Sequence, residues 1–161
     1  MIDKMGWEPV QPFPFSAARE AFAGLTSEDG RVVMHYFLRK ADQSLVATVG
    51  FGPRSEGAPG TVHGGSILTV LDEALGAASW LAGRPVLTVR LNTQFRKSLP
   101  IGANCLIETR LTGERHRLVF VEGTLRGADG VLYAEAQGQF MRLDPATQRR
   151  FFGRATILKD S

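Results

Sequence analysis

The chain has 161 residues, of which 43% are hydrophobic and 22% are charged, and its net charge is +3. This length and composition are typical of one soluble globular domain that can bury a core. The small basic excess argues against a nucleic-acid partner, whose binding surface would concentrate Lys and Arg, but it suits a small polyanionic ligand. One cysteine, Cys105, excludes an intrachain disulfide, and the sequence has no Cys/His cluster typical of a metal site.

The first thirty residues (1–30) are expected to form an N-terminal arm. They lack a basic stretch followed by an apolar run, and the sequence has no apolar segment of about 18 residues, so we expect a cytoplasmic protein without a membrane partner. Pro and Phe are frequent in residues 1–15, which predicts irregular structure. Residues 16–24 predict a short helix that Ser16 caps and Gly24 ends.

The next part of the chain predicts a hairpin and a long helix. Residues 31–40 and 45–51 are rich in β-branched and aromatic residues and flank a turn at 41–44. Leu, Ile, Val and Ala then recur at helical spacing over residues 64–81, and the sequence Gly83-Arg84-Pro85 ends the helix.

Four further strands are predicted after the helix, over residues 86–96, 104–112, 117–126 and 131–142. One helix on one face of an antiparallel sheet of about six strands is an α+β architecture. The hotdog fold, in which a curved sheet wraps one long helix, is one candidate of this class. We expect residues 31–145 to form this domain and residues 146–161 to be a C-terminal tail without a predicted element.

Asp72 lies in the middle of the predicted helix, where core residues are expected. At about 100° per residue, Asp72 falls on a stripe of mostly small residues beside the apolar face. The residues within roughly 60° of it are Gly65, Leu68, Thr69, Gly76 and Ser79. An exposed helix face usually carries Lys, Glu or Arg instead, so the stripe predicts close approach of a backbone or ligand at Asp72. Glu73 points elsewhere and is expected to be a solvated neighbour.

Gly64 and Gly65 open the helix, where free backbone N–H groups and the helix dipole attract anionic atoms. Without side chains there, these N–H groups can reach a ligand oxygen, as in an oxyanion hole or a phosphate site. Gly64 and Asp72 are about 12 Å apart along the helix axis. Both groups must lie about 3 Å from one reacting group, so a catalytic site that uses both requires a second, antiparallel copy in a C2 dimer.

The segment from Glu56 to Gly65 (EGAPGTVHGG), with Asp72 following His63 after the glycine pair, resembles the H-G-G…D signature of hotdog-fold acyl-CoA thioesterases of the PaaI and thioesterase-superfamily-member type. The resemblance continues through residues 86–102 and covers about residues 45–142. It implies hydrolysis of an acyl-CoA thioester by a homodimer with one continuous sheet, or by a homotetramer of two such dimers, with no metal and no redox cofactor.

The resemblance also assigns catalytic roles. It implies that Asp72 is the catalytic carboxylate, which either activates water as a general base or attacks the thioester directly. The Gly64 N–H of the partner chain would polarise the thioester carbonyl. His63 would shape this loop and assist at the carbonyl, and Thr88 would position the water or the carboxylate.

Substrate contacts are expected at Gly65, Gly57, Arg96 and Lys97. Many relatives carry Asn or Gln at the position of Gly57, where it helps at the thioester, so this chain departs from that pattern. Arg96 and Lys97 lie at a strand end before a proline turn, where they meet the CoA phosphates or simply decorate a loop. In the N-terminal arm, candidates for the acyl pocket are Phe13, Phe15 and Phe22.

Two other functions remain open from the residues. A hotdog dimer that binds acyl-CoA without hydrolysing it, as a sensor or scaffold, would keep the same fold. A hydratase or dehydratase of this fold usually pairs its Asp with a His about five residues away. No histidine follows Asp72 until His116, which argues against that reaction.

Overall fold

The computed structural model describes residues 2–13 and 30–152. Their elements follow the order β1 (Trp7–Pro9), β2 (Val32–Arg39), β3 (Ser44–Phe51), a 3₁₀ turn (Pro53–Ser55), α1 (Gly64–Leu81), β4 (Val86–Phe95), β5 (Asn104–Arg115), β6 (Leu118–Gly127), β7 (Leu132–Arg142) and α2 (Pro145–Phe152). The strands form one antiparallel sheet in the order β1-β2-β3-β5-β6-β7-β4, so β1 and β4 are its two edges.

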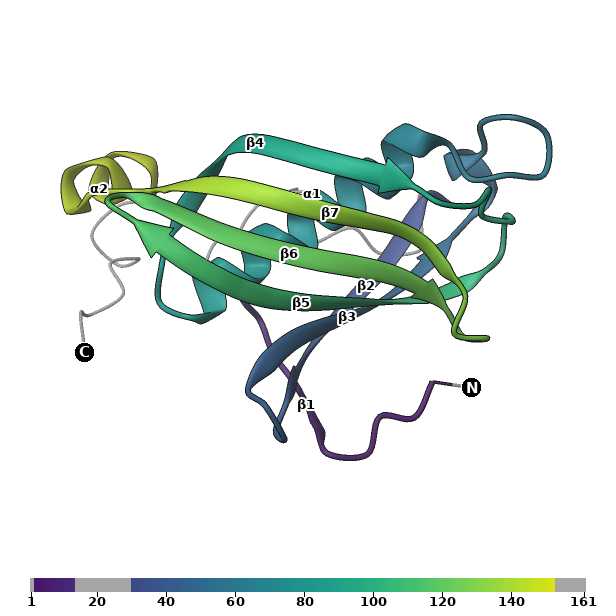
Figure 1. The fold of residues 1–161 in the computed structure, drawn as a ribbon, viewed down its shortest axis with the longest axis horizontal. Coiled ribbons are helices and arrows are strands. Elements are labelled where there is room, and N and C mark those ends of the chain that lie inside the picture. Colours follow the sequence, from purple (N-terminus) through teal and green to yellow (C-terminus); the bar gives the residue numbers. More distant parts are fainter. Residues whose placement is uncertain (1, 14–29, 153–161) are drawn as a thin grey trace.

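The curved sheet wraps the long helix α1. In Figure 1, α1 runs behind β4, β7, β6 and β5, while β2 and β3 continue the sheet at a steep angle to these strands. The helix contacts β3, β4, β5, β6 and β7. The predicted hotdog arrangement of the α+β class is therefore confirmed.

Helix α1 packs very close to the sheet at Leu75. This side chain is fully buried and lies between two glycines on neighbouring strands, Gly123 of β6 and Gly138 of β7. A Cβ atom at Gly123 would come within 2.6 Å of Leu75 Cδ1, and one at Gly138 within 3.2 Å of Leu75 Cδ2. The two glycines therefore make the groove that seats the helix.

Most predicted elements are confirmed, and three expectations need correction. The segment 1–15 was expected to be irregular, but Trp7–Pro9 adds a seventh strand by pairing with β2. The strand expected at 104–112 continues to Arg115. The tail, for which no element was predicted, begins with α2 at Pro145–Phe152. The short helix expected at 16–24 lies outside the described residues.

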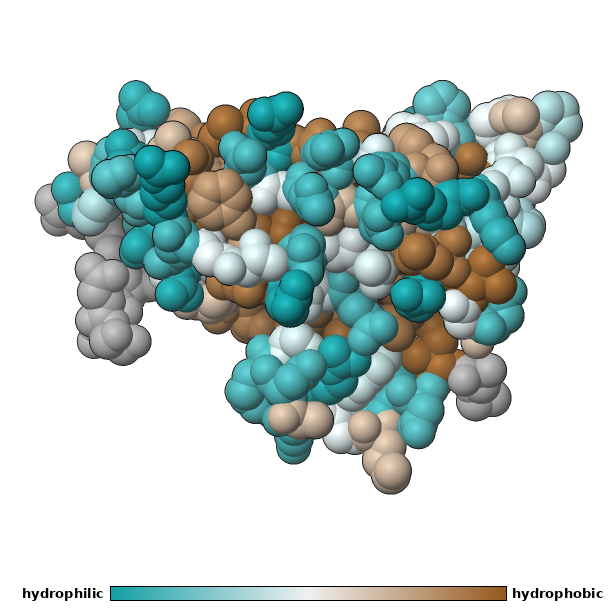
Figure 2. Space-filling model, in the orientation of Figure 1, coloured by the Kyte–Doolittle hydropathy of each residue, from teal (hydrophilic) through white to brown (hydrophobic). Residues whose placement is uncertain are grey.

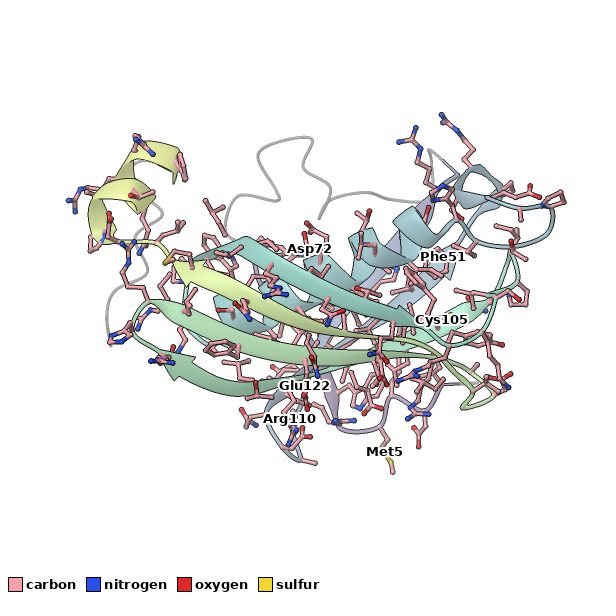
Figure 3. The ribbon with its side chains drawn as sticks, turned by 45° about the horizontal axis from the view of Figure 1, so that its top comes forward. Met5, Phe51, Asp72, Cys105, Arg110 and Glu122 are labelled. Atoms are coloured by element: carbon pink, nitrogen blue, oxygen red, sulfur yellow. The ribbon has the colours of Figure 1, made fainter. Side chains whose placement is uncertain are left out.

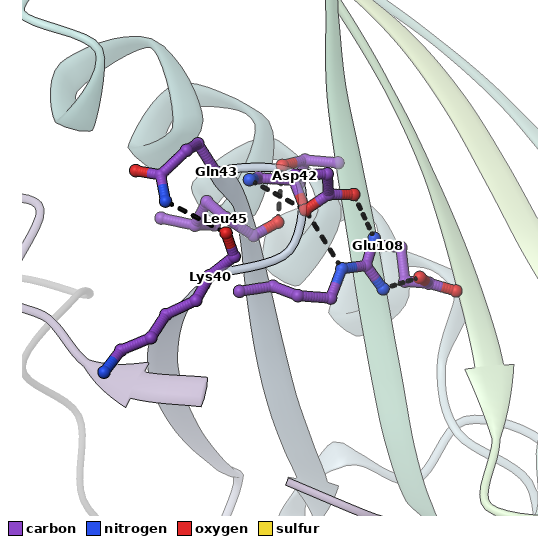
Figure 4. A network of polar contacts seen from close by, with 8 residues as sticks. Lys40, Asp42, Gln43, Leu45 and Glu108 are labelled. Carbon is purple, nitrogen blue, oxygen red and sulfur yellow. Dashed lines mark hydrogen bonds and ion pairs between the residues drawn. The ribbon is translucent and has the colours of Figure 1, made fainter. Parts of the chain in front are cut away.

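The outer face of the sheet is polar and ion-paired. Arg39 bonds both Asp42 in the β2–β3 turn and Glu108 of β5 (Figure 4). Further along this face, Arg110 pairs with Glu122 across β5 and β6. A concavity of about 760 Å³ lies here. Because these carboxylates are bonded to arginines, the face has the character of a solvated sheet surface.

No helix within the described ranges is both long enough and apolar enough to cross a membrane.

Candidate active site

Asp72 and Thr88 come together in a cavity beside the edge strand β4. Thr88 Oγ1 donates a hydrogen bond of 2.8 Å to Asp72 Oδ1, which joins the middle of α1 to the start of β4. Figure 3 shows Asp72 on the side of the molecule where β4 passes the helix. Both residues line a cavity of about 490 Å³. The structure therefore brings together Asp72 and Thr88, the two side chains to which the resemblance assigns catalytic roles.

A β-bulge in β4 accompanies this contact. Thr88 pairs with Phe140 of β7, but the next pair is Arg90 with Gln139, so Val89 is an extra residue in the ladder. A bulge reverses the alternation of a strand and often directs a side chain at a functional site. Here Thr88 precedes the bulge and faces α1.

The start of α1 leaves one backbone donor for a ligand. Of the four N–H groups that open a helix, Gly65 N donates to His63 Nδ1 (2.8 Å), and the N–H groups of Ser66 and Ile67 donate to His63 O at 2.9 and 3.2 Å. Only the Gly64 N–H remains without a hydrogen-bond partner among the described residues. This is the donor that the sequence predicted for the carbonyl oxygen.

His63 is the N-cap of α1, and the glycines around it provide room for its ring. Its Nδ1 accepts a hydrogen bond, so the neutral ring carries its hydrogen on Nε2. A Cβ atom at Gly65 would lie 2.9 Å from His63 Nδ1, and one at Gly57 would lie 2.8 Å from His63 Cα. The Gly65 N–H, a predicted substrate contact, is thus already hydrogen-bonded to His63. Gly57, the other predicted contact in this loop, lets the loop backbone pack closely against His63.

Replacing His63 separates its capping role from any chemical role. His63→Ala is expected to lower the free energy of unfolding by about 1 kcal/mol, because the helix loses its side-chain cap. His63→Asn keeps a capping acceptor and should restore most of that stability, yet it lacks the Nε2–H donor. Urea unfolding and kcat/KM should be measured for both variants. Full activity in a stable His63→Asn variant would limit His63 to capping.

A second, smaller cavity lies at the start of the helix. It has a volume of about 340 Å³ and is lined by Gly64, Phe95, Arg96 and Lys97, among others. Arg96 forms an ion pair of 2.6 Å with Glu135, while Lys97 is exposed and has no ion pair with another described residue. Of the two predicted phosphate ligands, Lys97 is therefore the more available.

Asp72 and Gly64 line different cavities of the same chain. Their separation along one helix, about 12 Å, accounts for this. One chain thus holds both halves of the predicted site, and it does not bring them together.

Glu73 is placed differently from the prediction. It was expected to be a solvated neighbour, but it is half-buried and lines the same cavity as Asp72. Burial, together with the negative charge of Asp72, raises the pKa of Glu73 to about 7. The helical pattern could not predict the burial of Glu73, because it contains no information on Phe13. Phe13 is distant in sequence, lines the cavity, and contacts Trp80 and Tyr36. Phe13 lines the cavity as expected, whereas Phe15 and Phe22 lie outside the described residues.

Cys105 is a buried core residue, as its isolation in the sequence indicated. Burial raises the pKa of its thiol to about 12, so the thiolate that a cysteine nucleophile requires is strongly disfavoured. Within residues 2–13 and 30–152, no group of three His, Cys, Asp or Glu side chains is arranged to hold a metal ion.

Comparison with known proteins gives consistent matches. The family model described as thioesterase superfamily matches residues 59–134, which include Gly64, Asp72 and Thr88. Acyl-coenzyme A thioesterase THEM4 from Bos taurus is 33% identical over 120 residues, which make up 73% of this chain and 49% of that protein. The chain spans about half the length of the curated relatives it matches.

Two solved structures share the fold. Zebra fish thioesterase superfamily member 2 superposes with a TM-score of 0.66 at 22% identity, over 80% of this chain and 91% of that chain. A Streptococcus mutans UA159 protein bound to acetyl CoA has a TM-score of 0.60 at 23% identity, over 62% of this chain and 81% of that chain. At these identities the two structures establish the architecture alone.

Proposed function

We propose that the protein hydrolyses an acyl-CoA thioester to the free acid and CoA, since residues 59–134 match the family model described as thioesterase superfamily. The observation that carries this proposal is the Asp72 carboxylate, which Thr88 orients in a cavity lined mainly by apolar side chains. The names of the curated relatives and the acetyl CoA bound to the Streptococcus mutans neighbour support acyl-CoA as the substrate class.

In the proposed reaction, Asp72 removes a proton from a water molecule as that water attacks the thioester carbon. The Gly64 N–H of the partner subunit donates a hydrogen bond to the carbonyl oxygen, which becomes negative in the tetrahedral intermediate. The C–S bond then breaks, the proton held by Asp72 passes to the leaving sulfur, the carbonyl reforms as a carboxylic acid, and CoA leaves as the thiol. Thr88 holds the carboxylate toward the water, and Lys97 is placed for a CoA phosphate near Gly64.

We place the second subunit along the free edge strand β4. Three large apolar side chains of this strand are exposed in the single chain: Leu87 at 49%, Val89 at 56% and Phe95 at 52%. Figure 2 shows hydrophobic atoms along the upper margin of the molecule, where β4 lies in Figure 1. An exposed apolar edge strand is a template for pairing with another chain. Pairing of two β4 edges would give the continuous sheet that the resemblance implies.

A charge on this edge should dissociate the dimer. Val89→Lys is expected to shift the protein to a monomer, because each subunit would have to bury a lysine in the paired edge. Size-exclusion chromatography with light scattering measures this directly, and thiol release should fall in parallel. Met5→Lys, at a position 88% exposed on the arm, provides the control and should stay dimeric. A monomeric wild type that hydrolyses acyl-CoA would contradict the shared site.

Free-thiol release from a panel of acetyl-, hexanoyl-, palmitoyl-, phenylacetyl- and benzoyl-CoA tests the proposed activity. We expect hydrolysis of at least one of these. If no thiol is released while an acyl-CoA raises the Tm, the protein is an acyl-CoA-binding dimer and the proposed reaction is wrong.

A further inference from the structure

The cavity that holds Asp72 contains a second carboxyl group. Glu73 follows Asp72 directly on α1 and lies on the helix face that also carries Gly76 and Trp80, three and seven positions further on. All four residues line the same cavity of about 490 Å³. The reaction proposed above uses only one of the two carboxyl groups.

Glu73 differs from the other two polar side chains of this cavity, those of Asp72 and Thr88, in its hydrogen bonding. Four aromatic rings contribute to the lining, and they belong to Phe13, Trp80, Phe140 and Phe151. Asp72 and Thr88 are bonded to each other. The Glu73 carboxyl has no hydrogen-bond partner among the described residues. Because the side chain is half-buried, a ligand that fills the cavity displaces water from this carboxyl and must replace the hydrogen bonds of that water.

The protonation of Glu73 suits donation to a ligand. Its pKa of about 7 leaves a large fraction of the carboxyl neutral near physiological pH, and a neutral carboxyl has an O–H donor. Burial, and to a smaller extent the negative charge of Glu73, raises the pKa of Tyr36. The Tyr36 hydroxyl is directed at Met34 Sδ, 4.0 Å away, so it is not the missing partner.

We propose that Glu73 is a specificity-determining residue that donates a hydrogen bond to an oxygen of the acyl group beyond the thioester carbonyl. The preferred substrates are therefore acyl-CoAs whose acyl group carries a hydroxyl or keto oxygen. This inference rests on the proposed hydrolysis at Asp72, because it assumes that the cavity lined by Asp72 and Glu73 binds the acyl group.

The test compares hexanoyl-CoA with 3-hydroxyhexanoyl-CoA and 6-hydroxyhexanoyl-CoA, which carry the added hydroxyl near the thioester and far from it. In wild type, kcat/KM for at least one hydroxylated substrate should exceed that for hexanoyl-CoA roughly ten- to a hundredfold. In Glu73→Leu this ratio should fall to about one. Glu73→Gln retains an N–H donor and should keep most of the ratio, mainly through KM.

The outcomes separate the two proposals. If wild type hydrolyses hexanoyl-CoA but shows the same ratios as Glu73→Leu and Glu73→Gln, the role of Glu73 is wrong and the proposed hydrolysis stands. If wild type hydrolyses none of the three substrates nor any member of the wider panel, the proposed function fails and the role of Glu73 fails with it. Should Glu73→Leu not fold, Glu73→Ala provides the same comparison.

Discussion

Replacing Asp72 by asparagine is expected to lower kcat for thioester hydrolysis by about 10³-fold, because the amide cannot take a proton from water. Asn has nearly the same shape as Asp, and its side-chain oxygen can still accept the hydrogen bond that Thr88 donates at 2.8 Å. The fold should therefore survive, and KM should change little. Thiol release with saturating substrate measures the loss, and an unchanged Tm shows that the site is intact.

Thr88 provides the matched control for this prediction. Thr88→Ser keeps the hydroxyl that bonds Asp72 and should retain most activity, whereas Thr88→Ala removes it and should lower kcat about tenfold. The smaller loss reflects positioning of the base and not its removal. Undiminished hydrolysis by Asp72→Asn would show that another group activates the water, and the account of this site would be wrong.

The second large effect concerns stability and pH. The pKa of Glu73 is raised to about 7 in the folded chain from its usual 4.5, so the folded state holds a proton that the unfolded state releases. Stability is therefore unaffected below pH 4.5, falls as the pH rises from 4.5 to 7, and stays lowered above pH 7. The total loss is about 3 kcal/mol, since each pKa unit corresponds to about 1.4 kcal/mol.

Glu73→Gln should remove this pH dependence, because glutamine has no proton to release. At pH 5 the variant and wild type should have similar stabilities, whereas at pH 8 the variant should melt roughly 5–10 °C higher. Thermal unfolding at fixed protein concentration across this range measures the difference. Glu8→Gln, at an exposed position on β1, should leave the wild-type profile unchanged. A constant difference between Glu73→Gln and wild type from pH 5 to pH 8 would show that Glu73 is not desolvated.

The sequence predicted the long helix well because its signals are local. His63, the glycine pair and the stop at Gly83 act within a few residues, and α1 spans Gly64–Leu81 as expected. The Asp72–Thr88 contact was also predicted, through resemblance to known thioesterases. Periodicity alone places Asp72 on a stripe of small residues and does not identify its partner on β4.

Other features depend on contacts between distant segments, which local patterns do not contain. Strand β1 has only three residues and exists because it pairs with β2. The bulge at Val89 becomes visible only in the ladder with β7. Glu73 was expected to be a solvated neighbour of Asp72, because the covering ring of Phe13 comes from another part of the chain.

The central claim is that each active site combines Asp72 of one subunit with the Gly64 N–H of the other. Gly64→Pro deletes this N–H at the first position of α1, where proline is well tolerated. His63 already has the extended backbone that a residue before proline prefers. Gly64→Ala is the control that keeps the N–H, and its added Cβ would make ordinary contact with Phe95.

The most direct measurement is thiol release by a mixed dimer. Asp72→Asn and Gly64→Pro chains should each be nearly inactive alone, yet an equal mixture that is unfolded and refolded together should recover about a quarter of wild-type activity. Half of the dimers would then be mixed, and each would contain one intact site made from the two unmutated residues. A mixture no more active than its separate components would contradict a site shared between subunits.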